Sequence, residues 1–402
     1  MAENQDQEQE QEQEKRVIIV GAGLAGLAIA HGLKKNNIPH LILDRESTPR
    51  GRNWGITLSW ALPLFTDILP ERLASNLRQC QPDLSLPSAV AGKKGVLIRD
   101  GSTGKTLAEA HFPVIRRMQI QKTKRALAEG LDVKAGKKLI DIRVLDGGGV
   151  EAIFEDGSVE RGGVVVGCDG GASAVRRWLL GEKQAAQEVL PFAFMNFAFS
   201  LPADKARWLD AEMNPSVDVA AHPKGMYLGL FILDKPDLEK PEGWVFYILA
   251  TWPIQGEEDE TNAENRLERL RAKMGGWADP YKSVVEWLDD GVQIGRDALR
   301  IWHPVPWENF GGRVSLAGDA AHSMTFHRGQ GGNLAIKDAH EFVATMVKVR
   351  DGMPLADAMR VYDEGVRERG EEVEISKQQA IAFHDFERFL ESPVVQMGIK
   401  PK

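Results

Sequence analysis

The segment Val17–Ala30, with the sequence VIIVGAGLAGLAIA, most constrains how this chain can fold. Four β-prone apolar residues run directly into a Gly-x-Gly-x-x-Gly turn, and an Ala- and Leu-rich helical stretch follows. A second apolar strand, His40–Leu43, ends at Asp44. This order of elements predicts a βαβ unit that binds a dinucleotide.

Each conspicuous residue of the unit has a physical role in such a site. We expect Gly21 to permit the tight turn, Gly23 to let the backbone approach a pyrophosphate, and Gly26 to allow close packing of helix on strand. The unpaired N–H groups at the helix start would face the phosphates. Asp44 stands where a carboxylate would accept hydrogen bonds from ribose hydroxyls.

A basic loop follows the second strand and contains Arg45, Arg50 and Arg52. Arginines beside a phosphate site are candidate partners of the pyrophosphate. The alternative is an exposed loop whose charges are solvated. We assign Arg45 and Arg52 to the cofactor site as a prediction.

Charge and cysteine content exclude several classes of protein. Six carboxylates behind the formal net charge of −8 lie in residues 1–14, which contain no basic residue, so the rest of the 402-residue chain is nearly neutral. A nucleic-acid partner is therefore not expected. The Gln/Glu-rich tail itself should be disordered. The two cysteines, Cys80 and Cys168, have no metal-type spacing and indicate a reducing, cytoplasmic setting without a metal site. No membrane anchor is expected.

The next part of the chain predicts a helix, a meander and another strand–turn–helix unit. We expect a helix from Val114 through Leu127, with Ile120, Thr123 and Leu127 on one face. Alternating segments from Leu139 to Phe154, separated by Gly-rich turns, predict an antiparallel meander. A buried strand then ends in a sharp turn at Asp169 and Gly170.

Residues 186–300 differ in character because they are rich in tryptophan, phenylalanine and alternating strands. They predict a second sheet that forms the wall of a cavity. His222, Tyr227 and Tyr247 are candidates for substrate contact, although packing in the core is the expected role of each.

The chain then returns to the style of its first segment. A strand ends at Gly318-Asp319, a glycine-rich loop follows (Gly329, Gly331, Gly332), and a helix runs from near Asn333. His322 is expected to have a structural role. His327 and Arg328 lie between the two motifs and are our candidates for catalytic residues, with loop scaffolding the equal alternative for His327.

Taken together, these motifs resemble those of single-component FAD-dependent monooxygenases of the p-hydroxybenzoate and salicylate hydroxylase class. The family pattern includes the glycine turn, an Arg-x-x-Leu-type helix start, an Asp-Gly turn, and Gly-Asp-Ala-Ala-His followed by Gly-x-Gly-x-Asn. Arg117 matches the helix start, with Arg116 as the alternate. Phe326 stands where the family commonly has proline, and this part of the chain looks most like fungal oxygenases of natural-product pathways.

The resemblance implies an α/β fold, in which a Rossmann-like FAD-binding domain carries an inserted mixed or antiparallel substrate sheet and C-terminal helices. It implies that Arg117, Asp169, Gly170, Gly318, Asp319, Gly329, Gly331, Gly332 and Asn333 bind FAD. The expected organisation is a tail (1–14), a FAD-binding domain in two parts (15–185 and 301–350), a substrate domain (186–300) and C-terminal helices (351–402).

The implied activity is hydroxylation or epoxidation of an aromatic or apolar small molecule with molecular oxygen. NADPH or NADH would reduce FAD during a transient visit, and a flavin C4a-hydroperoxide would deliver the oxygen atom, possible only where water is excluded. The alternatives are a flavoprotein dehydrogenase or redox-neutral cyclase without oxygen insertion, and a catalytically silent nucleotide-binding partner protein.

Overall fold

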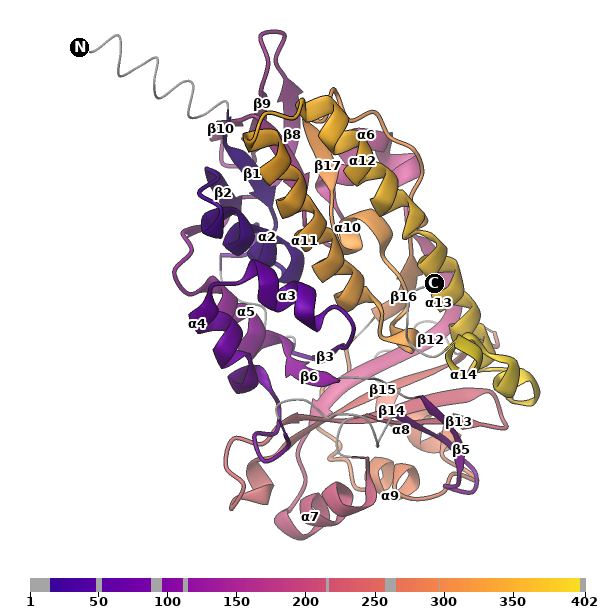
Figure 1. The fold of residues 1–402 in the computed structure, drawn as a ribbon. Helices are drawn as coiled ribbons and strands as arrows, with labels where there is room; N and C mark the ends of the chain where they lie inside the picture. Colours follow the sequence, from indigo (N-terminus) through magenta and orange to yellow (C-terminus); the bar gives the residue numbers. More distant parts are fainter. Residues whose placement is uncertain are drawn as a thin grey trace.

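The computed structural model describes residues 15–47, 53–87, 96–110, 115–214, 217–256, 265–295 and 297–397. Two large sheets organise these residues (Figure 1). One belongs to the part of the molecule that contains the glycine turn, and the other crosses the opposite part of the molecule.

The first sheet has five parallel strands, and β1 is its centre. Its order is β17 (Val314–Leu316), β11 (Val164–Gly167), β1 (Val17–Val20), β2 (His40–Leu43) and β7 (Val133–Lys134). Ile18 pairs with Val165 on one side and with Leu41 on the other. All four residues of β1 are buried, as expected for a parallel strand covered on both faces.

Helices from distant parts of the sequence pack beside this sheet. The long helix α11 (Gly331–Arg350) lies against α2 (Leu24–Lys35), α3 (Leu62–Ile68) and α12 (Leu355–Glu368). Gly32 of α2 allows the close approach to α11, because a Cβ there would lie 2.5 Å from the side chain of Val343. The C-terminal third of the chain therefore completes the core that the first segment begins.

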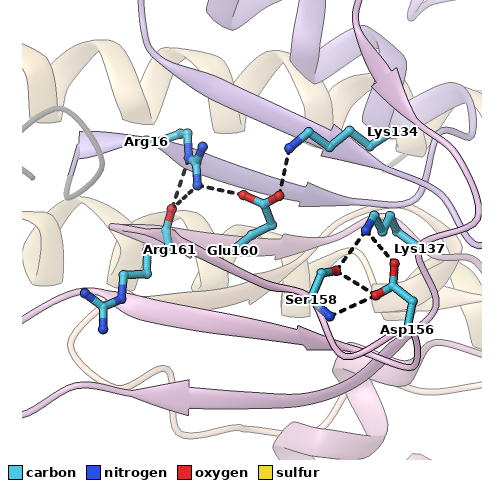
Figure 2. A network of polar contacts seen from close by, with 7 residues as sticks. All are labelled: Arg16, Lys134, Lys137, Asp156, Ser158, Glu160 and Arg161. Atoms are coloured by element: carbon cyan, nitrogen blue, oxygen red, sulfur yellow. Dashed lines mark hydrogen bonds and ion pairs between the residues drawn. The ribbon is translucent and has the colours of Figure 1, made fainter. Parts of the chain in front are cut away.

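The predicted antiparallel meander is present as a three-stranded sheet. Its strands are β8 (Leu139–Val144), β9 (Val150–Phe154) and β10 (Val159–Gly162). Ion pairs attach it to the first sheet, since Glu160 accepts from Arg16 at 3.1 Å and from Lys134 at 2.7 Å (Figure 2). Such partly exposed pairs contribute about 1 kcal/mol or less each, so the buried apolar face of the meander is the main attachment.

The second large sheet has seven strands and includes the aromatic segments. Its order is β16 (Asp297–Ile301), β12 (Glu188–Phe199), β15 (Val245–Pro253), β14 (Met226–Asp234), β13 (Asp218–His222), β4 (Val96–Asp100) and β5 (Thr106–Ala110). Strands β4 and β5 come from the stretch that we assigned to the first part of the FAD-binding domain. The sheet is thus built from three separate regions of sequence.

Helices cover the second sheet on its two faces. On the outer face pack α7 (Ala203–Glu212), α8 (Arg266–Lys273) and α9 (Tyr281–Glu286). The inner face contacts residues at and beyond the end of α13 (Glu371–Ala382), including Phe383, Phe389 and Val394. Short elements η5 (Phe386–Glu391) and α14 (Pro393–Met397) end the described chain. Within the described ranges, no helix is long and apolar enough to cross a membrane.

One predicted helix boundary is wrong. Val114 lies outside the described residues, and residues 116–119 form strand β6 (Arg116–Gln119), which pairs with β3 (Gly55–Leu58). Helix α5 begins only at Ile120 and ends at Ala128. Strand pairing with a distant segment overrides the local helical pattern here, while the predicted buried face of Ile120, Thr123 and Leu127 is confirmed.

Candidate functional site

A single cavity of about 1090 Å³ extends from the glycine turn to the inner face of the seven-stranded sheet. It brings together most residues that the sequence marks as site residues. Those that line it are Gly21, Gly23, Asp44, Arg45, Arg117, Asp169, Gly170, Gly318, Asp319, His327, Arg328, Gly329, Gly331 and Gly332. Gly26 and Asn333 lie behind the wall, and Arg52 lies outside the described residues.

The glycine turn begins the cavity, and its three glycines have different surroundings. Gly21 has φ +107°, and a Cβ there would lie 2.5 Å from the carbonyl oxygen of Cys168. A Cβ on Gly26 would overlap the carbonyl oxygen of Gly21. A Cβ on Gly23 would have the carbonyl oxygen of Cys168, at 3.8 Å, as its nearest neighbour outside the local chain, and would face the cavity. Gly21 and Gly26 are therefore required by the fold, whereas Gly23 leaves room for a ligand.

Asp44, at the end of β2, holds the glycine turn. Its carboxylate accepts from the backbone N–H of Ala22 at 2.6 Å and from that of Glu46 at 2.8 Å. Arg45 beside it is exposed and lines the same end of the cavity. The carboxylate thus shapes the turn while its residue also lines the ligand space.

Asp169 follows the end of β11 and lines the cavity beyond the glycine turn. It accepts from the hydroxyl of Ser173 at 2.5 Å and from the N–H of Ala174 at 2.6 Å, at the start of α6 (Ala174–Ala185). Burial raises the pKa of the Asp169 carboxyl, and these hydrogen bonds oppose the rise. Arg176 of the same helix donates to the carbonyl of Ala320 at 2.9 Å and so connects the turn at Asp169 to the segment around Asp319.

A buried ion-pair network supports the segment that contains Gly318 and Asp319. Gly318, with φ +63°, donates its N–H to Asp338 at 2.7 Å. Asp338 also bonds His322 at 2.7 Å and Arg369 at 2.6 Å. Burial opposes charge on His322, but the charge of Asp338 and the hydrogen bond to it outweigh burial and raise the pKa of His322. His322 therefore serves the structure, while Asp319 next to Gly318 faces the cavity, where desolvation raises the pKa of its carboxyl.

The start of α11 opens on the cavity. Gly331 and Gly332 of its first turn line the wall, and Gln330 at the cap position makes no side-chain capping bond. Asn333 stabilises this end from behind, since it accepts from the N–H of Ser59 at 2.9 Å and donates to the carbonyl of Thr57 at 3.0 Å. The free N–H groups of the first turn are left available to an acceptor in the cavity.

Arg117 lies between the two ends of the cavity. From strand β6 it donates to the hydroxyl of Thr57 at 3.0 Å, and its guanidinium lies 4.5 Å from the ring centroid of Phe231. Burial lowers the pKa of Arg117 to about 10, and the nearby Tyr227 and Tyr247 oppose this shift. Among the described residues no carboxylate pairs with this arginine, which favours a ligand as its partner.

The inner face of the seven-stranded sheet forms the far wall, and it is mainly apolar and aromatic. Phe194, Tyr227 and Tyr247 line it, together with Leu249 and Val219. A hydrogen-bonded chain interrupts this surface. The hydroxyl of Tyr247 donates to Asn196 at 2.9 Å, and Asn196 donates to Asp297 at 2.6 Å. The far end thus combines an apolar lining with a few directed polar groups, which is usual for a small-molecule site.

The two catalytic candidates lie in the turn η4 (Phe326–Arg328) at this end. His327 is buried, and burial lowers its pKa well below the ordinary value. Arg328 is fully buried and forms an ion pair with Glu372 at 2.9 Å. Both residues line the cavity, and the ion pair connects η4 to α13. His222 lies elsewhere, where its ring stacks on Trp277.

Several wall residues escape a motif search. Asn196, Asp297, Phe383 and strand β4 all line the cavity, and none belongs to a motif. Only Asn196 leaves a sequence signal, because it is the one polar residue between Phe192 and Phe199 on an otherwise apolar strand. The others come to the wall through long-range pairing.

These features fit FAD. Two uncapped helix starts, those of α2 and α11, open on one cavity, and the first turn of α2 contains no acidic residue. Gly23 leaves space that a Cβ would fill, and the carboxylate of Asp319 faces the same space. Helix starts favour negative charge, and a carboxylate accepts from hydroxyl groups, so a flavin dinucleotide matches the set of groups present.

Comparisons with known proteins agree with this fit. Residues 121–376 match the FAD binding domain family, and residues 19–61 match the NAD(P)-binding Rossmann-like domain. The chain is 32% identical over 395 residues to the FAD-dependent monooxygenase phnB of Penicillium herquei, which covers 96% of this chain and 95% of that protein. It is 31% identical over 394 residues to the FAD-dependent monooxygenase cctM of Talaromyces islandicus, covering 96% and 97%.

Among solved structures, the fold is similar to Klebsiella pneumoniae HpxO complexed with FAD and uric acid. The TM-score is 0.74 at 19% identity, with 96% of this chain and 93% of that chain covered, which supports the fold alone. The resemblance drawn from the motifs is confirmed by the family match and by the two fungal relatives. The protein therefore belongs to the family of FAD-dependent monooxygenases that carry this FAD binding domain.

Proposed function

We propose that the protein uses NADPH or NADH and molecular oxygen to hydroxylate or epoxidise an aromatic or apolar small molecule, within fungal secondary metabolism. The observation that carries the proposal is the continuous cavity, which joins the glycine turn to an aromatic sheet face. The named activities and fungal sources of the relatives support the oxygenase assignment. The match of residues 19–61 supports a nicotinamide nucleotide as the donor.

In this proposal the chain's own groups hold FAD at several points. The start of α2 and Arg45 would hold its diphosphate, and Asp44 and Asp319 would accept from its hydroxyl groups. The N–H groups at the start of α11 would stabilise negative charge on the reduced ring. When bound and reduced, FAD activates molecular oxygen for transfer of one oxygen atom to the substrate.

The sheet wall would exclude water and orient the substrate. Phe194, Phe231 and Leu249 supply an apolar surface, and the hydroxyls of Tyr227 and Tyr247 supply directed polar contacts. Dry surroundings matter because water would compete for the activated oxygen. His327, neutral because burial lowers its pKa, would act as a hydrogen-bonding group in the wall. We assign Arg328 to positioning η4 through Glu372.

The test is oxygen incorporation. The purified holoenzyme is mixed with NADPH or NADH and a panel of bicyclic and tricyclic aromatic compounds under ¹⁸O₂. We expect one compound or more to accelerate nicotinamide oxidation and to gain a single ¹⁸O atom. Turnover of a compound under strictly anaerobic conditions would contradict the proposal and favour a dehydrogenase or cyclase. Apoprotein that takes up no FAD would contradict the cofactor assignment as well.

Replacing Asp319 by alanine should weaken FAD binding. A hydrogen bond to a charged group contributes roughly 1.5–3 kcal/mol, so we expect the Kd of FAD to rise about tenfold or more. The measurement is a fluorescence titration of apoprotein with FAD. Asp319→Asn, which keeps an acceptor oxygen, should have a Kd for FAD between those of wild type and Asp319→Ala. The control Glu286→Ala removes an exposed carboxylate on the outer helix α9 and should leave the Kd unchanged. Unaltered affinity in Asp319→Ala would remove this residue from the site.

A further inference from the structure

Thr251 connects the cavity wall to the C-terminal helices through two histidines. It lies on β15 and is fully buried. Its hydroxyl oxygen is 3.3 Å from Nε2 of His327 and 3.0 Å from Nε2 of His384. One hydroxyl, with a single proton, therefore lies between two ring nitrogens.

The surroundings of His384 determine where every proton of this group lies. Its Nδ1 is 2.5 Å from the carbonyl oxygen of Ala380, and a carbonyl can only accept, so Nδ1 carries a proton. Burial lowers the pKa of His384 to about 4, so the ring is neutral at pH 7 and carries a single proton. The backbone of Thr251 also contacts this ring, but the hydrogen bond to Ala380 is the stronger of the two, so the proton lies on Nδ1 and Nε2 is an acceptor. The hydroxyl of Thr251 must then donate to His384.

The same count of protons determines which ring nitrogen of His327 is protonated. Because the only proton of Thr251 is used toward His384, its oxygen accepts from the ring of His327, which must carry its proton on Nε2. Burial lowers the pKa of His327 well below the ordinary value, so this ring is neutral too, and its Nδ1 has no proton. Within the described chain Nδ1 has no hydrogen-bond partner, and as a bare acceptor it leaves no N–H group unsatisfied.

The orientation of His327 matters because Phe326 stacks on it. The two ring centroids are 4.3 Å apart with an interplanar angle of 19°. Phe326 also contacts Phe194 at 5.2 Å and Tyr227 at 5.8 Å, and all three side chains line the cavity. A rotation of the His327 ring would therefore displace a part of the wall that faces the ligand space.

We propose that Thr251 is a positioning residue of the far end of the cavity. Its hydroxyl fixes the tautomer of His327 and so holds the Phe326 ring in the wall. The tautomers follow from the hydrogen-bond contacts together with the neutral state of both rings, and they do not depend on what the cavity binds. Only the catalytic value of a fixed wall rests on the proposed function, so the two can fail separately.

The test uses ¹⁵N-histidine NMR of the FAD-loaded protein at pH 7. Wild-type protein should show His327 as the Nε2–H tautomer and His384 as the Nδ1–H tautomer, with the ring protons of His327 shifted upfield by the stacked Phe326. Thr251→Val keeps the shape and removes the hydroxyl. We expect a mixture of His327 tautomers and a loss of at least half of the ring-current shift, while Thr251→Ser retains the wild-type pattern.

Two results would overturn the proposal. One is a wild-type spectrum with the reverse tautomers or with a protonated His327 at pH 7, and this measurement needs no variant. The other is a folded Thr251→Val protein in which both the tautomer and the ring-current shift are unchanged. Should the valine variant fail to fold, the wild-type spectrum and its comparison with Thr251→Ser still decide between the assigned hydrogen-bond chain and its reverse.

Discussion

Alanine at position 23 is expected to leave the apoprotein folded and to reduce its affinity for FAD at least about tenfold. A Cβ on Gly23 would come no closer than 3.8 Å to the carbonyl oxygen of Cys168, its nearest neighbour outside the local chain, and φ is −80°, so the fold tolerates it. The added methyl group would instead occupy cavity space at the start of α2, where the backbone must approach a pyrophosphate. FAD titration and urea unfolding of the apoprotein measure the two effects separately. If the free energy of unfolding of the apoprotein fell by as much as the binding free energy of FAD, Gly23 would be needed by the fold rather than by the ligand.

Gly26→Ala provides the contrast. Its Cβ would overlap the backbone of Gly21, so we expect apoprotein stability to fall by about 1–3 kcal/mol or more together with FAD affinity. Gly243→Ala is the matched control, because a Cβ there would meet nothing within 4 Å. It should change neither quantity.

Replacing Asp338 by asparagine is expected to destabilise the fold by about 3–5 kcal/mol, because it removes the charge from a fully buried ion-pair network. The asparagine amide would also face donors on Gly318, His322 and Arg369, of which it can accept from fewer. Urea unfolding of the apoprotein measures the loss. Glu341→Gln is the control, since Glu341 contacts the same Arg369 at 2.7 Å but is 35% exposed, and its loss should cost about 1 kcal/mol or less.

The stabilities of wild type and Asp338→Asn should also depend differently on pH. The pKa of His322 is raised in the folded protein, so its contribution is complete below the unfolded value of 6.5 and is lost as pH rises through the folded value. The pKa of Asp338 is lowered despite burial, because His322 and Arg369 outweigh desolvation. Its contribution is present above about 3.9, its ordinary value, and is lost only in acid. The stability difference between wild type and Asp338→Asn should therefore narrow as pH rises above about 6.5. A constant difference from pH 6 to 9 would show that His322 does not carry a raised pKa.

The sequence predicts which residues line the end of the cavity at the glycine turn, because that end is built from local segments. Gly21, Gly23 and Asp44 belong to one βαβ unit, and steric limits on a tight turn are visible in the sequence itself. Gly318 and Asp319 similarly follow a strand, because β17 ends at Leu316 and Asp319 begins the next short helix. The predicted fold class is confirmed. It was predictable because each strand–turn–helix unit has its own local sequence pattern.

The far end could be predicted only in part: the aromatic strands indicate a sheet that forms a cavity wall, but pairing between distant segments completes that wall. Strands β4 and β13 pair in parallel although their sequences are far apart, and this pairing brings Ile98 to the wall. The same cause misplaced the helix start near Arg117, where β3 is the partner. The network around Asp338 was also missed, since Arg369 reaches it from a separate helix.

The parallel pairing of β17 with β11 has a consequence for the order in which the protein is made. The segment from β17 to the start of α11 lies far along the chain from the glycine turn, yet it supplies Asp319 and the N–H groups that face the cavity. A ribosome must therefore synthesise the chain at least through Gly332 before these parts of the cavity wall exist. The glycine turn is made long before them, so it waits for segments synthesised much later before it can complete a binding site for the flavin.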